Sequence, residues 1–294
     1  MAVFNLGSIN IDHVYRVPSL PNPGETLSAR EYGRGLGGKG ANQSIAAASA
    51  GAETHHIGAI GKGDEWVLEP FLRLGLDQTH IRSLDQTTGH AIIYVDAAAE
   101  NCIVLHDGAN HAITEDQIDG ALALAKPGDW LILQNETCLV AYAAARAKAN
   151  GMRVAYSAAP FVAAEVEAVS GSIDLLVLNE GEAALLEEAL PAFGETHPDL
   201  AWLVTRGANG SLYRHGGEET KVPAQPAQAA DTTGAGDTYL GYFIAALDAG
   251  RTIREAMTEA SAAAAIQVSH HGAASAIPLR QDVDEYLRNL APPP

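Results

Sequence analysis

The stretch from Asp231 to Thr238 constrains the fold more than any other part of the chain. It reads D-T-T-G-A-G-D-T and leads into an apolar segment, 239–247, which predicts a helix that ends before Gly250. Two glycines directly before a helix let the backbone turn tightly and expose several N–H groups at the positive end of the helix dipole. The stretch therefore predicts an anion-binding turn at the start of a helix.

The carboxylate of Asp237 stands beside this turn, where it would repel a bound phosphate. Its placement is explained if Asp237 takes a proton from an alcohol that attacks the phosphate. The alternative is an aspartate that only caps a buried helix. A cap, however, needs neither both glycines nor a second aspartate, Asp231, six residues upstream. We therefore favour phosphoryl transfer.

The chain after Thr114 alternates between helical and strand-like segments. Strands are predicted at 130–133, 153–156, 175–178 and 202–204, and helices at 115–125, 139–149, 162–169, 181–189, 237–247, 253–268 and 282–290. This alternation predicts βαβ units, a parallel sheet and right-handed crossovers. Earlier in the chain, 2–6 and 55–60 also read as strands and 66–74 as a helix. With 294 residues, the chain can form one large α/β domain or two small ones.

Two segments in the first half of the chain predict β structure outside this alternation. Residues 13–32 are too irregular for a helix and too apolar for a linker, and their flanks, 13–17 and 26–32, have β character. Residues 89–95 and 101–105 alternate as the strands of a hairpin do. We interpret the two segments as a β excursion from the main domain, which makes them a candidate lid.

A glycine-rich run at 33–40 leads into an alanine-rich helix that ends near Ala50. Residues 33–39 fit the first seven positions of a P-loop, but Gly40 stands where the magnesium-binding Ser or Thr belongs. Three glycines also match the dinucleotide fingerprint of nicotinamide-dependent oxidoreductases: Gly33, Gly35 and Gly38. The strand that must precede that fingerprint is doubtful, because the β excursion intervenes. We favour close approach of these backbone N–H groups to a polyhydroxyl ligand, with Asn42 adding a side-chain amide.

The composition limits the partners that the protein can have. A formal net charge of −18 argues against nucleic acid and anionic membranes, but not against a nucleotide that is bound by local dipoles. The two cysteines, Cys102 and Cys138, are too few for a disulfide framework, and we expect both in the core. No run of about 18 apolar residues and no basic leader occurs, so we expect a cytoplasmic protein.

Polar residues follow the predicted strands at their carboxyl ends, which is where open α/β sheets bind ligands. These clusters lie at 10–12, 134–136, 179–182 and 205–210. Each alone could be a helix cap or a turn. Together with 231–238, they indicate one shared site.

Six motifs along the chain resemble, in their order, the ribokinase family of ATP-dependent sugar kinases, also called the PfkB family. They lie at 7–13, 23–26, 37–43, 106–110, 179–182 and 231–238. The last is highly specific, and G-G-K-G-A-N-Q at 37–43 is fairly specific. The resemblance implies a single kinase domain, 1–294, with a three-layer α/β/α fold and a mainly parallel sheet of roughly nine strands. It also implies a β lid formed by 12–34 and 88–106 and a homodimer that forms through that lid.

The resemblance further implies phosphoryl transfer from ATP to the primary 5-hydroxyl of D-ribose. Asp237 would be the catalytic base, and the anion hole would stabilise charge on the transferred group: Gly234, Ala235 and Gly236. The residues expected to contact the sugar are Asn10, Asp12, Gly38, Lys39, Asn42, Glu136 and Asp237. Carboxylates and amides suit vicinal hydroxyls, although Lys39 could instead be a surface charge.

The same resemblance assigns the nucleotide and two metal ions. ATP would contact Asn179, Thr205, Gly207, Gly210 and Gly236. Magnesium would be held through water by Asn179 and Glu182, since this ion keeps several of its waters. Potassium would be held by Asp231, Thr233, Gln267, His270 and Gly272. The position that often carries a hydroxyl ligand in the family is Ala276 here, which puts potassium activation in doubt.

Three alternatives stay open at this point. The same chemistry could act on deoxyribose, a ketohexose or a nucleoside. A nicotinamide-dependent oxidoreductase could use residues 33–38. A catalytically silent sugar-binding regulator is the third, and the intact Asp237 and its glycine turn argue against it.

Overall fold

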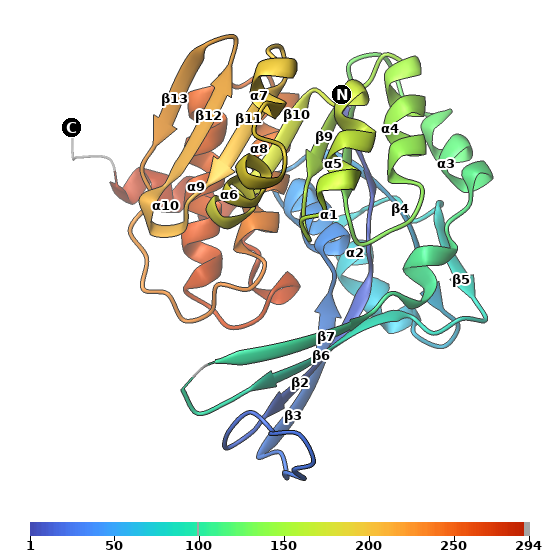
Figure 1. The fold of residues 1–294 in the computed structure, drawn as a ribbon, viewed down its shortest axis with the longest axis vertical. Helices are drawn as coiled ribbons and strands as arrows, with labels where there is room; N and C mark the ends of the chain where they lie inside the picture. Colours follow the sequence, from blue (N-terminus) through green and yellow to red (C-terminus); the bar gives the residue numbers. More distant parts are fainter. Residues whose placement is uncertain (99, 291–294) are drawn as a thin grey trace.

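A mostly parallel sheet forms the centre of the structure (Figure 1), a computed structural model that describes residues 1–98 and 100–290. Within those residues the sheet has nine strands in the order β13-β12-β11-β10-β9-β8-β1-β4-β5. Every neighbouring pair from β11 to β5 is parallel, and only β12 and β13 run antiparallel to their neighbours. The strands are β1 (Ala2–Leu6), β4 (Glu53–Gly61), β5 (Ile81–Leu84), β8 (Trp130–Gln134), β9 (Arg153–Ser157), β10 (Leu175–Asn179), β11 (Ala201–Thr205), β12 (Ser211–His215) and β13 (Glu218–Val222).

Helices cover both faces of this sheet, because successive side chains of each strand point to opposite faces and both sets are apolar. In β1, Phe4 and Leu6 belong to one core and Val3 to the other. The first core is covered by α3 (Glu115–Leu122), α4 (Val140–Ala149), α5 (Ala163–Val169), α6 (Glu180–Ala189) and α7 (Phe193–Thr196). The second is covered by α1 (Lys39–Ser49), α8 (Ala235–Asp248), α9 (Ile253–Val268) and α10 (Arg280–Leu290). The predicted three-layer α/β/α fold is confirmed.

A second, four-stranded sheet projects beyond the carboxyl ends of the central strands (Figure 1). Its order is β3 (Glu31–Gly37), β2 (Asn10–Arg16), β6 (Gly89–Val95) and β7 (Asn101–His106). Strand β2 pairs antiparallel with β3 and parallel with β6, so the two predicted β segments form one sheet.

Strand β3 also determines the structure of the glycine-rich run at 33–40. Gly33 and Gly35 lie inside this strand and pair with β2, and they do not form a turn after a strand of the central sheet. A dinucleotide fingerprint and a P-loop both require that turn. Both interpretations, and with them the nicotinamide-dependent oxidoreductase, are therefore wrong for residues 33–39.

Some elements differ from the sequence-based prediction. Strand β5 and the hairpin β12–β13 were not predicted, and 66–74 divides into a 3₁₀ turn (Glu65–Leu68) and the short helix α2 (Glu69–Leu74). Cys102 is exposed and Cys138 half-buried, so the expected core position is wrong for Cys102, which lies on the exposed edge strand β7. Among the described residues, no helix combines the length and apolarity that a membrane crossing requires.

Close packing of α1 against α8 sets the position of the site. A Cβ atom at Gly241 of α8 would lie 2.5 Å from Ala46 Cβ and 2.6 Å from Gln43 O of α1. A Cβ atom at Gly40 would lie 2.3 Å from Gly7 Cα. Only glycine allows these two approaches, and they bring the starts of α1 and α8 together.

The contact at Gly241 leads to a first prediction. Gly241→Ala should lower the melting temperature, because overpacking of this kind typically costs about 1–3 kcal/mol, and each kcal/mol is worth about 2–4 °C in a large domain. Helix propensity alone predicts the opposite sign, since Ala favours helices over Gly by about 1 kcal/mol. Differential scanning fluorimetry checks this, with Gly171→Ala as the control because its Cβ would meet no atom within 4 Å. Equal melting temperatures for the two variants would show that the helices do not depend on this contact.

Candidate active site

Asp237 lies in the first turn of α8 and faces two amides of α1. Its Oδ2 accepts a hydrogen bond from Asn42 Nδ2 at 3.1 Å, and its Oδ1 accepts one from Gln43 Nε2 at 2.8 Å. Burial raises the pKa of Asp237 to about 6, although Lys39, Asn42 and Gln43 act in the opposite direction. The carboxylate is thus ionised at neutral pH and more basic than an ordinary aspartate, which suits a general base.

A chain of buried amides fixes the orientation of Gln43. Its Oε1 accepts a hydrogen bond from Gln134 Nε2 at 2.6 Å, and the same nitrogen donates to Asn5 Oδ1 at 2.8 Å. Asn5 Nδ2 in turn donates to Gly40 O at 3.0 Å. Because Gln43 Oε1 is occupied in this way, its nitrogen faces Asp237. Sequence reasoning missed this chain, and its one local signal was a polar residue, Asn5, within an apolar strand.

The start of α8 is open to a ligand. Its first-turn N–H groups have no partner within the helix, and no side chain caps them in the described residues, whereas side chains of Thr114, Asn179 and Thr252 cap α3, α6 and α9. Gly234 precedes the helix with a φ of 78°. A Cβ atom at Gly236 would meet no atom within 4 Å, so the space beside this turn is free. The backbone N–H of Ala235 donates to Thr232 O at 3.3 Å. The anion hole at Gly234, Ala235 and Gly236 stays a prediction, and an accessible helix start is compatible with it.

Glu136 and Lys39 lie beside the start of α1. Glu136 Oε2 accepts hydrogen bonds from Ser8 Oγ at 2.6 Å and from the backbone N–H of Lys39 at 3.2 Å, and Lys39 Nζ lies 3.4 Å from Glu136 Oε1. Burial would lower the pKa of Lys39, but the carboxylates of Asp237, Glu136 and Glu182 together raise it. Lys39 therefore lies among charged groups of the site and is not an isolated surface charge.

Asn10 and Asp12 begin strand β2, at the junction of the two sheets. Asn10 Oδ1 accepts a hydrogen bond from Asn110 Nδ2 at 2.7 Å, and Asn110 Oδ1 accepts one from the backbone N–H of Ile9 at 2.9 Å. Burial raises the pKa of Asp12 to about 7, and the charge of Glu136 acts in the same direction. Asp12 also lines a cavity of about 740 Å³ beneath the small sheet. Gly38, the next predicted sugar contact, directly precedes α1.

Asn179 and Glu182 form a capping box at the start of α6. Asn179 Oδ1 accepts from the backbone N–H of Glu182, and Glu182 Oε2 accepts from the backbone N–H of Asn179, both at 2.8 Å. Burial raises the pKa of Glu182, while Asn179 and Lys39 counteract it. This pair thus has a structural role whether or not it also binds a ligand.

The remaining predicted nucleotide contacts follow β11. Thr205 ends that strand, and a Cβ atom at Gly207 would point into open space. Gly210 is tightly packed, since a Cβ atom there would lie 2.2 Å from Val222 O. Gly210 is therefore required for folding of the loop, and Gly207 is the glycine that a ligand can approach.

The residues predicted to bind potassium also lie together. Asp231 Oδ1 accepts from the backbone N–H of Thr233 at 2.9 Å, and Asp231 Oδ2 accepts from that of Gly272 at 3.0 Å. The side chain of Gln267 contacts the carbonyl oxygens of Thr233 and Gly272. His270 follows the end of α9 and is exposed. Among the described residues, no group of three or more His, Cys, Asp or Glu side chains is arranged to hold a metal ion.

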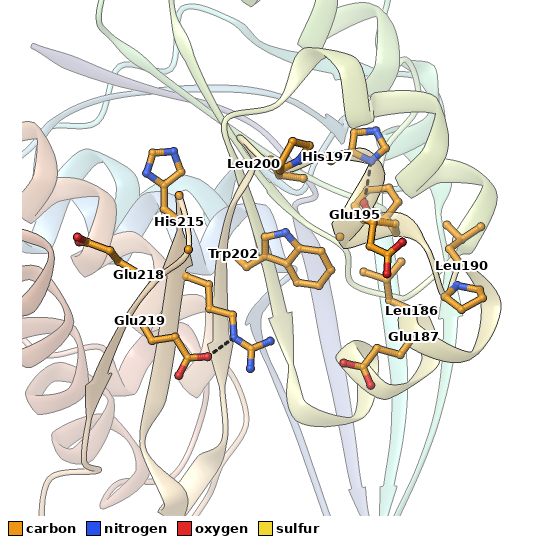
Figure 2. Close-up of a pocket in the computed structure, with 17 residues that line it drawn as sticks. Leu186, Glu187, Leu190, Glu195, His197, Leu200, Trp202, His215, Glu218 and Glu219 are labelled. Carbon is orange, nitrogen blue, oxygen red and sulfur yellow. Dashed lines mark hydrogen bonds and ion pairs between the residues drawn. The ribbon is translucent and has the colours of Figure 1, made fainter.

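A separate cavity of about 420 Å³ lies between α6, α7 and the hairpin β12–β13 (Figure 2). Figure 2 shows Trp202, near the start of β11, at its centre, with His197 and His215 on opposite sides. Because Trp202 lies at the amino end of its strand, this cavity opens at the end of the sheet remote from Asp237. None of the predicted site residues lines it.

The fold and the site are those expected of a phosphotransferase that acts on an alcohol group, and the comparisons with known proteins show that class. The model of the pfkB family carbohydrate kinase matches residues 2–280. The ribokinase of Haemophilus influenzae is 39% identical over 97% of each chain, and a deoxyribokinase of Salmonella typhi is 30% identical over 98% of this chain and 99% of its own. The structure of Arabidopsis thaliana ribokinase complexed with ribose and ATP is 27% identical, with a TM-score of 0.86 over 98% of this chain and 99% of that chain. The chain belongs to the pfkB family of carbohydrate kinases.

Proposed function

We propose that the protein transfers the γ-phosphoryl group of ATP to the 5-hydroxyl of D-ribose. The observation that carries this proposal is the carboxylate of Asp237, which has a raised pKa, is held by two amides and lies beside the open turn at Gly236. A relative that is 39% identical over 97% of both chains is a ribokinase, and a structural neighbour holds ribose and ATP. Because the phosphoryl donor is ATP, we propose a cytoplasmic location.

In the proposed mechanism, the sugar lies between β2 and the starts of α1 and α8. Asn10, Asp12, Gly38, Lys39, Asn42 and Glu136 bind its hydroxyls. Asp237 accepts the proton of the 5-hydroxyl as that oxygen attacks the γ-phosphorus, while the bond from this phosphorus to the β-phosphate oxygen breaks and ADP leaves. The anion hole at Gly234, Ala235 and Gly236 stabilises the charge on the transferred group. The Gln43–Gln134–Asn5 chain keeps Asp237 oriented for this step.

ATP would lie along the strand ends, with Asn179, Thr205, Gly207, Gly210 and Gly236 in contact with it. Magnesium fits this side of the site, because Glu182 Oε2 serves the capping box while Oε1 can accept a metal-bound water. When bound, magnesium would neutralise charge on the triphosphate. Potassium stays a prediction.

We also propose that the small sheet acts as a lid and as the contact of a homodimer. A lid over the site would exclude water, which would otherwise compete for ATP. The edge strand β7 exposes three consecutive apolar residues. The exposed fractions of Ile103, Val104 and Leu105 are 50%, 58% and 49%. An exposed apolar edge strand is a ready contact for a second chain.

Deoxyribose is the second candidate substrate, because one relative at 30% identity is a deoxyribokinase. The two sugars differ only at the 2-hydroxyl. If polar groups of the site bind the 2-hydroxyl of ribose, these groups stay unpaired when deoxyribose is bound, which disfavours deoxyribose. An ADP-release screen over pentoses, deoxyribose, ketohexoses and nucleosides tests the proposal. Highest kcat/KM with D-ribose supports it, and no acceleration by any of these compounds would overturn it.

Asp12 gives a prediction on substrate affinity. Asp12→Asn should raise the KM for ribose by about tenfold or more, because a charge-assisted hydrogen bond contributes about 1.5–3 kcal/mol, while kcat changes less. In the wild type, KM should fall as pH rises through about 7, where Asp12 becomes ionised. Asp12→Asn should remove this dependence, and Asp116→Asn on α3 is the exposed control. An unchanged KM would remove Asp12 from the sugar site.

A further inference from the structure

We propose that the side-chain amide of Gln267 takes the place of a monovalent cation beside the anion-binding turn, so that the kinase needs no potassium. This inference rests on the proposed function. Gln267 lies near the end of α9 and is fully buried. Its Nε2 lies 2.5 Å from Thr233 O and 3.4 Å from Gly272 O. Thr233 and Gly272 are two of the residues that were predicted to bind potassium.

The chemistry of these contacts requires a donor. A backbone carbonyl oxygen only accepts, so two carbonyls that converge on one point need either a cation or N–H groups between them. The amide nitrogen of Gln267 carries two hydrogens and can serve both. Thr233 directly precedes Gly234, which starts α8, so this amide ties α9 to the turn that would hold the transferred phosphoryl group.

The charge of Asp231 is also already compensated. Both of its carboxylate oxygens accept hydrogen bonds, from the backbone N–H groups of Thr233 and Gly272. The position that often carries a hydroxyl ligand in the family is Ala276 here, whose methyl group offers no oxygen. A potassium ion would have to displace the Gln267 amide. It would also find fewer oxygen ligands than a site with a hydroxyl side chain provides.

The opposite orientation of the Gln267 amide has a different consequence. It would turn Oε1 toward the two carbonyls, and three oxygens would then converge with no hydrogen between them. That arrangement requires a cation. The two orientations therefore predict opposite responses to potassium, which makes the proposal testable in the whole enzyme.

The test is a titration with potassium chloride at constant ionic strength, balanced with tetramethylammonium chloride. The wild type should reach full kcat without potassium and change by less than about twofold on its addition. Gln267→Glu keeps the shape but loses both N–H groups. Its kcat should fall about tenfold or more, which corresponds to the free energy of one hydrogen bond to a buried group. Potassium should restore the kcat of this variant. Gln281→Glu on the exposed face of α10 is the matched control and should behave as the wild type.

Thermal melting provides a readout that does not depend on activity. Potassium should raise the melting temperature of Gln267→Glu above that in tetramethylammonium, and it should leave the wild type unchanged. Activation of the wild type by about tenfold or more, or stabilisation of the wild type by potassium, would overturn the inference. Failure of the proposed function would appear differently, as no turnover of any sugar with or without potassium, and the melting experiment would still test Gln267.

Discussion

Asp237→Asn is expected to lower kcat by about 10²–10⁴-fold, the usual contribution of a positioned general base. Asparagine has nearly the same shape and can still contact Asn42 and Gln43 after an amide rotation, but it cannot accept the proton of the sugar hydroxyl. The KM values for ribose and ATP should change less than kcat. A coupled assay of ADP release under saturating substrates checks the size of the loss.

Two further measurements separate a lost base from a damaged fold. The melting temperature should not fall, because burial makes the ionised carboxylate costly, as its pKa of about 6 indicates. Asp199→Asn, the same change at an exposed loop position, should retain wild-type kcat. In the wild type, kcat/KM should fall as pH falls through about 7, where Asp12 is protonated, and fall further through about 6, because Asp237 is then protonated. Turnover of Asp237→Asn close to that of the wild type would remove Asp237 from the role of base.

Gly236→Ala is expected to lower kcat by about 10–10²-fold, with a melting temperature equal to or above that of the wild type. The added methyl would meet no protein atom within 4 Å. It would enter the space in which we propose that the transferred phosphoryl group lies. Loss of one oxyanion-hole donor costs about 10²–10³-fold in other enzymes, so partial obstruction should cost somewhat less. In a helix, Ala is more stable than Gly by up to about 1 kcal/mol.

The control for this variant is Gly120→Ala in α3, where the new Cβ would lie 3.7 Å from His80, an ordinary contact. Steady-state kinetics and differential scanning fluorimetry on both variants give the two readouts. A Gly236→Ala enzyme with unchanged kcat would mean that the phosphoryl group does not approach this turn. A destabilised one would mean that the space over Gly236 is not free.

The proposed catalytic residues could be placed together from the sequence because they lie in short contiguous motifs. Asp237 and the turn from Gly234 to Gly236 share one helix start, and Asn42 lies in the first turn of another. Physical chemistry of the local sequence was sufficient there: glycines before a helix, and a carboxylate beside them. The sequence also predicted correctly that strands alternate with helices after Thr114.

What could not be predicted depends on contacts between distant segments. The side chains of Gln134, Asn5 and Gln43 meet only because β8, β1 and α1 are neighbours in the fold. Local sequence patterns do not predict the order of strands in a sheet. Strand β3 was predicted only in part, as the β character of 26–32, because glycines such as Gly33 and Gly35 disfavour strands. Pairing with β2 overrides that preference. The sequence predicted Gln267 only as a potassium ligand, and the contact of its side-chain amide with Thr233 O depends on the fold.

The central claim is that this site phosphorylates the 5-hydroxyl of ribose, and identification of the product by ³¹P NMR tests it most directly. The wild type is incubated with ATP, magnesium and D-ribose, and the spectrum is recorded with proton coupling. Phosphorylation at the 5-hydroxyl predicts a new phosphomonoester signal that the two protons on C5 split into a triplet. This signal should be absent with Asp237→Asn over the same time. No new phosphomonoester, or a doublet from phosphate on a carbon that bears one proton, would contradict it.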